Sequence, residues 1–245
     1  MKRTTKILLA SGLAAVGWRA LRGHQSRGSD VLGPDGVADL YDHVAPVYDA
    51  IAGAYQTAAG LSLHRRAVDA LGLQLGDTAV DLACGTGINF QYLVEAVGAT
   101  GRVVGVDLSL GMLDLARRRV EANGWGNVTL IEGDVRQVTF PDPVHGVLST
   151  FGLEMVPEHE DVIRRAVDAL AMGGRLAIGG LRRPEGWPEW LIRVAELLNR
   201  PFGVSRAYEG IQPWRSVEAH AEGYRYEEFL LGAAYLATGT TPPTP

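Results

Sequence analysis

The chain has 245 residues, with 47% hydrophobic and 21% charged side chains, a composition that allows a single α/β domain with a complete core. Its 23 Lys and Arg against 28 Asp and Glu leave a net charge of −5, which excludes a strongly basic nucleic-acid-binding surface, so no nucleic-acid partner is expected. One cysteine, Cys84, excludes an internal disulfide and favours a reducing, cytoplasmic compartment, and no Cys/His spacing is typical of a metal site.

Residues 1–22 form a hydrophobic segment bounded by basic side chains. The apolar run covers residues 7–18 and would span about 18 Å as a helix, less than the ~30 Å hydrocarbon core of a bilayer. Basic residues on both sides disfavour cleavage and export. Two interpretations stay open: a shallow anchor at a membrane surface, and a helix lying on the domain or a frayed tail.

Residues 23–36 are rich in Gly, Ser and polar side chains and are expected to form a linker, which leaves residues 37–245 as the folded domain. The domain opens with a short helical or turn segment at residues 40–49. This segment carries two Tyr-Asp pairs seven residues apart, beginning at Tyr41 and Tyr48.

Regular alternation of strands and helices follows. Apolar runs predict strands at residues 78–83, 102–107, 128–132, 144–150 and 175–179. Apolar residues at helical spacing predict helices at residues 61–71, 88–97, 110–122 (with Ser109 as N-cap), 158–171 and 189–199. Two final runs, at residues 224–231 and 233–238, are expected to meet at Gly232 as a hairpin. The alternation is typical of a parallel, doubly wound α/β sheet.

A glycine turn after the first of these strands is the strongest chemical signal in the chain. Such a turn lies at the carboxyl end of a strand, where α/β sheets bind ligands. Gly85 and Gly87 match a dinucleotide-binding fingerprint, but Phe90 stands where that fingerprint requires a third glycine or alanine. Asp81 lies inside the strand end, where a carboxylate would repel a pyrophosphate. An NAD-dependent oxidoreductase is therefore the less favoured interpretation.

Acidic residues end three successive predicted strands and suit a different ligand. Asp81 could face a cationic amine, Asp107 could accept hydrogen bonds from two ribose hydroxyls, and Asp134 could accept from an adenine amino group. S-adenosylmethionine has all three groups and no phosphate. Three acids that match three parts of one ligand favour this cofactor.

Residues 80–87 (Val-Asp-Leu-Ala-Cys-Gly-Thr-Gly) resemble the first motif of the class I S-adenosylmethionine-dependent methyltransferases. Residues 105–113, 132–134, 147–153 and 171–176 resemble the segments that follow it. The resemblance implies a Rossmann-like fold with a seven-stranded, mostly parallel sheet whose last strand is antiparallel. It also implies cofactor contacts from the turn and from the ends of later strands, at Asp81, Ala83, Gly85, Gly87, Asp107, Leu108, Met112, Asp134, Val135 and Thr150.

The start of the domain is similar to ubiquinone/menaquinone C-methyltransferases and to bacterial phospholipid N-methyltransferases. This likeness implies a hydrophobic small molecule or lipid as methyl acceptor. Tyr41 and Tyr48 are candidates to steady the sulfonium cation with their aromatic faces, and His43, His145 and Glu154 are candidates for a general base. A non-catalytic scaffold with the same fold is the alternative from a different functional class.

Overall fold

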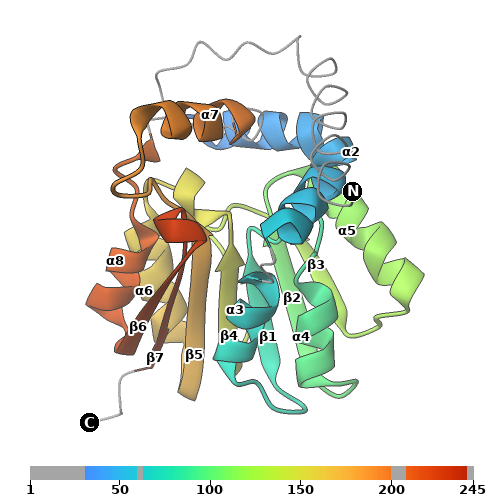
Figure 1. Ribbon diagram of the computed structural model, residues 1–245. Coiled ribbons are helices and arrows are strands. Elements are labelled where there is room, and N and C mark those ends of the chain that lie inside the picture. The colour runs from blue at the N-terminus through green and yellow to red at the C-terminus, as the bar shows by residue number, and fades with distance from the viewer. Residues whose placement is uncertain (1–30, 60–62, 200–207, 242–245) are drawn as a thin grey trace, which may run out of the picture.

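A computed structural model of the chain describes residues 31–59, 63–199 and 208–241, which build an α/β fold around one seven-stranded sheet (Figure 1). The strand order is β3-β2-β1-β4-β5-β7-β6. The strands are β1 Thr78–Leu82, β2 Arg102–Asp107, β3 Val128–Glu132, β4 Val144–Thr150, β5 Leu170–Leu181, β6 Glu222–Phe229 and β7 Ala234–Thr240.

Strand direction follows the expected pattern. Strands β1 to β5 pair in parallel, whereas β7 runs antiparallel between β5 and β6. The carboxyl ends of β1 to β4 therefore meet at one edge of the sheet, and the chain order reverses between β1 and β4, which is where such sheets bind ligands. The predicted doubly wound sheet with an antiparallel last strand is confirmed.

Helices cover both faces of the sheet and its carboxyl edge. The helices α3, α4 and α5 pack on one face and α6 and α8 on the other, while α2 and α7 lie across the carboxyl ends of the strands (Figure 1). Their bounds are α2 Pro34–Ala59, α3 Leu63–Leu71, α4 Phe90–Val97, α5 Leu110–Asn123, α6 His159–Ala169, α7 Glu189–Asn199 and α8 Pro213–His220, with short 3₁₀ turns η2 Leu153–Met155 and η5 Leu230–Gly232.

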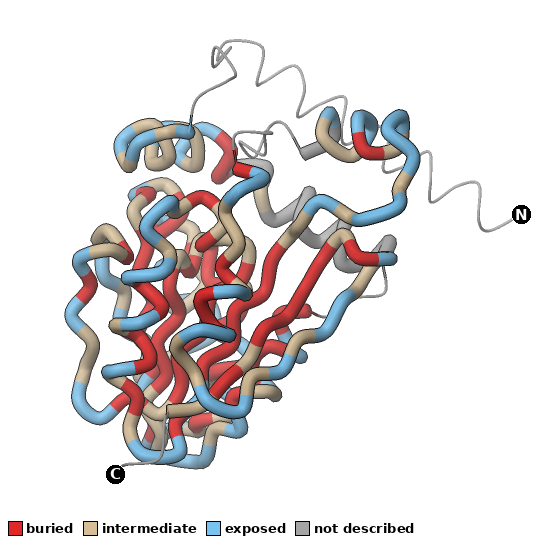
Figure 2. Tube along the Cα trace, turned by 90° about the vertical axis from the view of Figure 1, so that its left-hand side faces the viewer, coloured by how far each residue is buried: buried red, intermediate tan, exposed pale blue. Residues whose placement is uncertain are grey.

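Two hydrophobic cores follow from the alternation of side chains along each strand. Along β1, Val80 and Leu82 face the core shared with α6 and α8, whereas Ala79 faces the core shared with α3 and α4. Figure 2 shows the result as a continuous buried centre beneath helices that alternate between buried and exposed residues. Burial of each large apolar side chain contributes roughly 1.5–3 kcal/mol, so both cores stabilise the sheet that positions the strand ends.

Phe90, the residue that breaks the dinucleotide fingerprint, is fully buried where α4 meets the sheet. A Cβ atom on Gly87 or on Gly105 would lie 2.5 Å from its ring. The aromatic ring therefore fills the space that a third glycine would leave for close packing of helix and strand. Phe90, which breaks the dinucleotide fingerprint, thus has a packing role in this fold.

Several predicted boundaries are wrong. Helix α2 begins at Pro34, inside the predicted linker, because Pro is well suited to the first turn of a helix. It then continues through the predicted short segment at residues 40–49. Strand β5 begins at Leu170, so Gly173 and the glycine after it lie within the strand and do not end helix α6. Helix α8 was not predicted, since its apolar residues are too few to show a helical period.

Other predictions agree closely with the structure. Strands β2, β3 and β4 and helix α7 have the predicted bounds, and Ser109 caps α5 by accepting a hydrogen bond from the Met112 backbone. The hydrophobic segment at residues 1–22 and most of the predicted linker lie outside the described residues. Within the described ranges, none of the helices is both long and apolar enough to cross a bilayer.

Candidate active site

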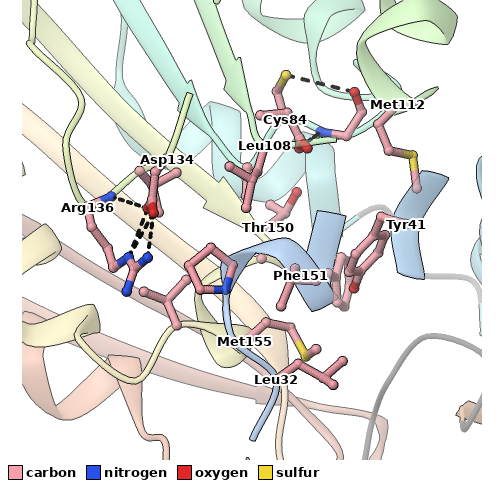
Figure 3. A pocket seen from close by; sticks show the side chains of 18 of the residues that line it. Leu32, Tyr41, Cys84, Leu108, Met112, Asp134, Arg136, Thr150, Phe151 and Met155 are labelled. Atoms are coloured by element: carbon pink, nitrogen blue, oxygen red, sulfur yellow. Dashed lines mark hydrogen bonds and ion pairs between the residues drawn. The ribbon is translucent and has the colours of Figure 1, made fainter. Parts of the chain in front are cut away.

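A cavity of about 320 Å³ lies at the carboxyl ends of β1 to β4, within the usual range for small-molecule sites. One wall consists of the loops that follow these strands together with His64 of α3, and we call it the strand wall (residues 64, 83–89, 107–112, 134–136 and 150–152). The opposite wall consists of residues 31–48, at the start of the described chain and in α2, which we call the helix wall. Figure 3 shows both walls around the cavity.

The glycine turn supplies backbone to the strand wall. Gly85 and Gly87 have φ values of +55° and +75°, which side chains rarely adopt, and this lets the backbone turn sharply between β1 and α4. Cys84, which comes directly before Gly85, is buried, and burial raises the pKa of its thiol well above the usual value. A protonated, buried thiol fits the interpretation of Cys84 as a small packing residue.

Asp107 lies on the cavity wall with its carboxylate held by backbone. Its Oδ2 accepts a hydrogen bond from the Gly85 N–H at 2.7 Å, and its Oδ1 accepts from the Ser109 N–H at 2.9 Å. Burial raises its pKa, and these backbone hydrogen bonds oppose that rise. Each oxygen keeps a second lone pair, so the carboxylate suits two adjacent hydroxyl groups such as those of a ribose.

Asp81 is fully buried and does not lie on the cavity wall. Both of its oxygens accept hydrogen bonds from the Asn89 carboxamide, at 3.2 and 3.0 Å. Burial raises its pKa to about 7, and the hydrogen bond from Asn89 opposes that rise. The prediction of direct contact with a ligand amine is therefore corrected: Asn89 stands between Asp81 and the cavity because the strand end points into the core.

Two polar residues on this wall were missed by the sequence analysis. Asn89 and His64 both line the cavity, and they join Thr150 and Asp81 in one buried hydrogen-bonded group. A polar residue two positions after Gly87, at the start of an otherwise apolar helix, was the available signal for Asn89. His64 gave no comparable signal, since a histidine among apolar residues of a helix is usually structural.

Asp134 lines the cavity, but its carboxylate is already engaged. The Arg136 guanidinium donates to both oxygens, with distances of 2.6–3.0 Å, and the Arg136 N–H donates to Oδ1 at 2.9 Å (Figure 3). This guanidinium contact holds the pKa of Asp134 below its usual value. A ligand amino group would therefore share the carboxylate with Arg136, which the sequence analysis did not foresee.

The remaining predicted contacts also lie on this wall. Ala83, Leu108, Met112, Val135 and Thr150 all line the cavity, and Figure 3 shows the last residue together with Leu108 and Met112 facing it. Ala83 has a φ of +54°, which is strained for a residue with a Cβ atom. Gly152 makes that conformation possible, because a Cβ atom there would lie 2.4 Å from the Ala83 side chain.

The helix wall is apolar and aromatic. Tyr41 and Tyr48 both line the cavity, with ring centroids 6.4 Å apart, and Leu32 also lines it. Across the cavity, Phe151 and Met155 extend the apolar surface from the loop after β4 (Figure 3). The cavity therefore has a polar end at the strand loops and an apolar end under α2.

Asp42 fixes the helix wall to the strand wall. Its Oδ1 accepts a hydrogen bond from the Ser109 hydroxyl at 2.5 Å and from the Gly111 N–H at 2.8 Å, at the first turn of α5. The acidic member of the first Tyr-Asp pair thus serves as a second cap for α5, which favours negative charge at its N-terminus. The sequence analysis noted the pair but not this role.

The predicted bases do not reach the cavity. His43 is exposed and its Nδ1 binds the Asp39 carbonyl oxygen of the same helix at 2.7 Å. His145 lies at the opposite end of β4, where its Nδ1 accepts a hydrogen bond from the Thr78 N–H at 3.0 Å. Neither histidine lines the cavity, His43 because it lies on the exposed side of α2 and His145 because it lies at the amino end of β4, so neither is placed to act as a general base in this structure.

Glu154 is a different case, since its carboxylate is buried next to the cavity residue Met155 although the residue as a whole is partly exposed. The Tyr235 hydroxyl donates to its Oε1 at 3.1 Å, and no described residue bonds to its Oε2. Burial raises its pKa to about 7. Glu154 does not itself line the cavity.

Comparison with known proteins agrees with this geometry. Residues 79–174 match a family model described as a methyltransferase domain. The chain is 32% identical over 164 residues to a 2-phytyl-1,4-naphtoquinone methyltransferase of Thermosynechococcus vestitus, covering 62% of this chain and 69% of that relative. It is 38% identical over 105 residues to a demethylmenaquinone methyltransferase of Geobacillus kaustophilus, of which the match spans only 45%.

Solved structures share the fold at low sequence identity. The cyclase SpnF aligns with a TM-score of 0.67 at 15% identity, over 89% of this chain and all of that one. A phosphoethanolamine N-methyltransferase of Haemonchus contortus, solved with S-adenosyl-L-methionine, aligns with a TM-score of 0.63 at 16% identity, over 84% of this chain and 60% of that one. These likenesses show the fold alone.

Proposed function

The chain belongs to the class I S-adenosylmethionine-dependent methyltransferases, and from this premise we propose that it methylates a hydrophobic, quinol-like acceptor. The observation that carries the proposal is the division of one cavity into a polar strand wall and an apolar, aromatic helix wall. The names of the relatives support an aromatic ring with a long apolar chain as the acceptor.

The strand wall is proposed to bind the cofactor. We propose that the Asp107 carboxylate binds the ribose hydroxyls, that Val135 and Leu108 enclose the adenine, and that the backbone of the turn at Gly85 and Gly87 lies along the amino-acid end. The glycines allow the close approach of backbone to ligand, and Asp107 is already held by two N–H groups in the orientation that this requires. Bound S-adenosylmethionine supplies the methyl group from its sulfonium.

The helix wall is proposed to place the acceptor. Transfer of a methyl group is an in-line displacement, so positioning of the two reactants supplies most of the rate advantage. Tyr41 and Tyr48 present aromatic faces that would attract the sulfonium cation and pack against an acceptor ring. Burial raises the pKa of Tyr41 well above its usual value, which keeps its hydroxyl protonated at neutral pH.

The test is direct methyl transfer with the purified protein. Tritiated S-adenosylmethionine would be supplied with three acceptors: a demethylated menaquinol analogue, phosphatidylethanolamine and a simple phenol. Label in the quinol product is the expected result. Label only in the phospholipid would replace the proposed acceptor by a lipid amine, and cofactor binding without any labelled product would favour a non-catalytic role.

We further propose that the acceptor is met at a membrane surface, with residues 1–22 as anchor and residues 23–36 mainly as linker before the methyltransferase domain. One observation in the described residues supports this. Helix α7 presents Trp190, Val194 and Leu197 at helical spacing, and these side chains are 66%, 44% and 50% exposed. Such a stripe above the cavity end of the sheet suits an interfacial contact.

A vesicle assay tests the membrane proposal. The full chain is expected to sediment with vesicles of phosphatidylglycerol and phosphatidylcholine, and Leu197→Asp is expected to reduce the bound fraction. Met172→Asp is the matched control, because Met172 is 88% exposed but lies at the amino end of β5, away from α7. Equal loss in both variants, or no binding by the wild type, would contradict the proposal.

A further inference from the structure

His64 is the centre of a buried polar group that the cofactor placement above does not use. Its Nδ1 lies 2.7 Å from the Asn89 Oδ1 and 3.1 Å from the Thr150 hydroxyl oxygen. The ring is 7% exposed and packs against Phe151 with 5.4 Å between ring centroids. Helix α3 thus contributes a titratable side chain to the strand wall from outside the β1–α4 turn.

The Asp81 carboxylate can only accept hydrogen bonds, and this fixes the donor and acceptor in each bond that links His64, Asn89 and Asp81. The Asn89 Nδ2 donates to Asp81 and to the Thr150 hydroxyl oxygen, so its Oδ1 is the atom that faces His64. Two lone pairs would repel at 2.7 Å, and Nδ1 of His64 must therefore carry the proton. The imidazole then donates to Asn89, and Asn89 in turn donates to Asp81.

We propose, resting on the cofactor placement above, that His64 is a positioning residue for the amino-acid end of S-adenosylmethionine. By donating to Asn89 it prevents the carboxamide from rotating, so that Asn89 keeps donating to the Asp81 carboxylate. A charged Asp81 directly behind the wall attracts the cofactor's ammonium group, although the two do not touch. A rotated carboxamide would place its oxygen against the carboxylate and favour a neutral, protonated Asp81.

Asp81 is the member of this hydrogen-bonded group that titrates near neutral pH. Burial lowers the pKa of His64, the hydrogen bond with Asn89 opposes this, and the nearby Arg119 lowers the pKa further, so the imidazole is neutral at pH 7. Burial raises the pKa of Asp81 to about 7, Asn89 opposes the rise, and the neighbouring Asp107 adds to it. Loss of the hydrogen bond from Asn89 should therefore raise the pKa of Asp81 and weaken its charge at neutral pH.

Two ligands separate the proposed role from general support of the site. S-adenosylhomocysteine carries the amino-acid end, and 5′-methylthioadenosine lacks it but keeps the adenosine and the sulfur. Calorimetric titration of the full chain at pH 7 measures the affinity for each ligand. His64→Ala is expected to lower the affinity for S-adenosylhomocysteine by roughly tenfold, the usual effect of one buried hydrogen bond, and to leave the affinity for methylthioadenosine within about twofold of the wild type. Between pH 8 and pH 6.5 the variant should lose affinity for S-adenosylhomocysteine more steeply than the wild type.

Controls keep the result specific. The Gln side chain of His64→Gln can still donate to Asn89, and this variant is expected to recover most of the lost affinity. Val68→Ala removes a buried side chain from the same helix and should leave the affinity for both ligands unchanged. Equal weakening of both ligands, or an unchanged affinity for S-adenosylhomocysteine, would overturn the role of His64. Wild-type protein that binds neither ligand would instead overturn the cofactor placement on which the role rests.

Discussion

The strand wall and the helix wall face the same cavity but are built in different ways. On the strand wall, polar side chains such as Asp107 and Asn89 are buried and fixed by hydrogen bonds to backbone or to each other. On the helix wall, apolar and aromatic side chains stand on α2, which Asp42 joins to the body through two hydrogen bonds. The proposed cofactor and acceptor sites are therefore lined and held mainly by different side chains, and most substitutions should affect them separately.

The largest expected effect comes from the strand wall. Replacing Asp107 by Ala removes the carboxylate proposed to bind the ribose and also releases the Gly85 N–H, so affinity for S-adenosylhomocysteine should fall about 100-fold, or about 3 kcal/mol. Calorimetric titration measures it. Asp114→Ala, an exposed acid on α5, is the control. An affinity within threefold of the wild type would show that this wall does not hold the cofactor.

Glu154 tests how much an ionised carboxylate buried near the strand wall lowers the stability of the fold. Its pKa is about 7 in the folded protein against about 4.5 when unfolded, so folding favours its protonated form. The free energy of unfolding should therefore fall as the pH rises from about 4.5 to 7, by up to ~3 kcal/mol for this residue. Glu154→Gln stays neutral, and its stability should fall less than that of the wild type.

Urea denaturation at pH 5 and pH 8 gives the comparison for Glu154. Asp81 also has a raised pKa, but it is present in both proteins and cancels in the difference. The same loss of stability in wild type and Glu154→Gln would mean that Glu154 is not buried as described.

A smaller effect is expected where the helix wall is attached. Asp42→Ala removes an acceptor for the Ser109 hydroxyl and the Gly111 N–H, and should lower the free energy of unfolding by about 1 kcal/mol. The apparent KM for the acceptor should rise, while cofactor affinity stays within about threefold. Asp39→Ala, exposed on the same helix, is the control. A loss of cofactor affinity equal to the loss for the acceptor would break the division into two supports.

The smallest effect is expected at His43. Its side chain is exposed, does not line the cavity, and has its Nδ1 2.7 Å from the Asp39 carbonyl oxygen of its own helix. His43→Ala should leave the methylation rate within about twofold and the stability within about 0.5 kcal/mol. A pH-rate profile that loses one limb in this variant would restore His43 as a general base.

The division between the two walls also explains which parts of the site the sequence could reveal. Asp107 and the glycine turn were predictable because parallel strands bring their carboxyl ends to one edge, and position at a strand end can be read from apolar runs. The strands from residue 102 to residue 150 have the predicted bounds for the same reason. Local periodicity and the topology of parallel sheets are enough for these residues.

Tertiary packing decided the rest. Asn89, eight residues after Asp81, separates it from the cavity, and His64, 17 residues before it, bonds to Asn89 only when α3 packs on the sheet. Arg136 occupies the Asp134 carboxylate through a side-chain rotamer that no spacing predicts.

The turn at Gly85 thus identified the cofactor family from sequence alone, because one short stretch of chain carries its geometry. The proposed acceptor site depends on how α2 crosses the strand ends, and this is set by contacts such as that of Asp42 with Gly111, 69 residues apart in the chain. Local pattern determines the positions of strand ends and glycine turns. Long-range burial and hydrogen bonding determine which side chains finally face the ligand.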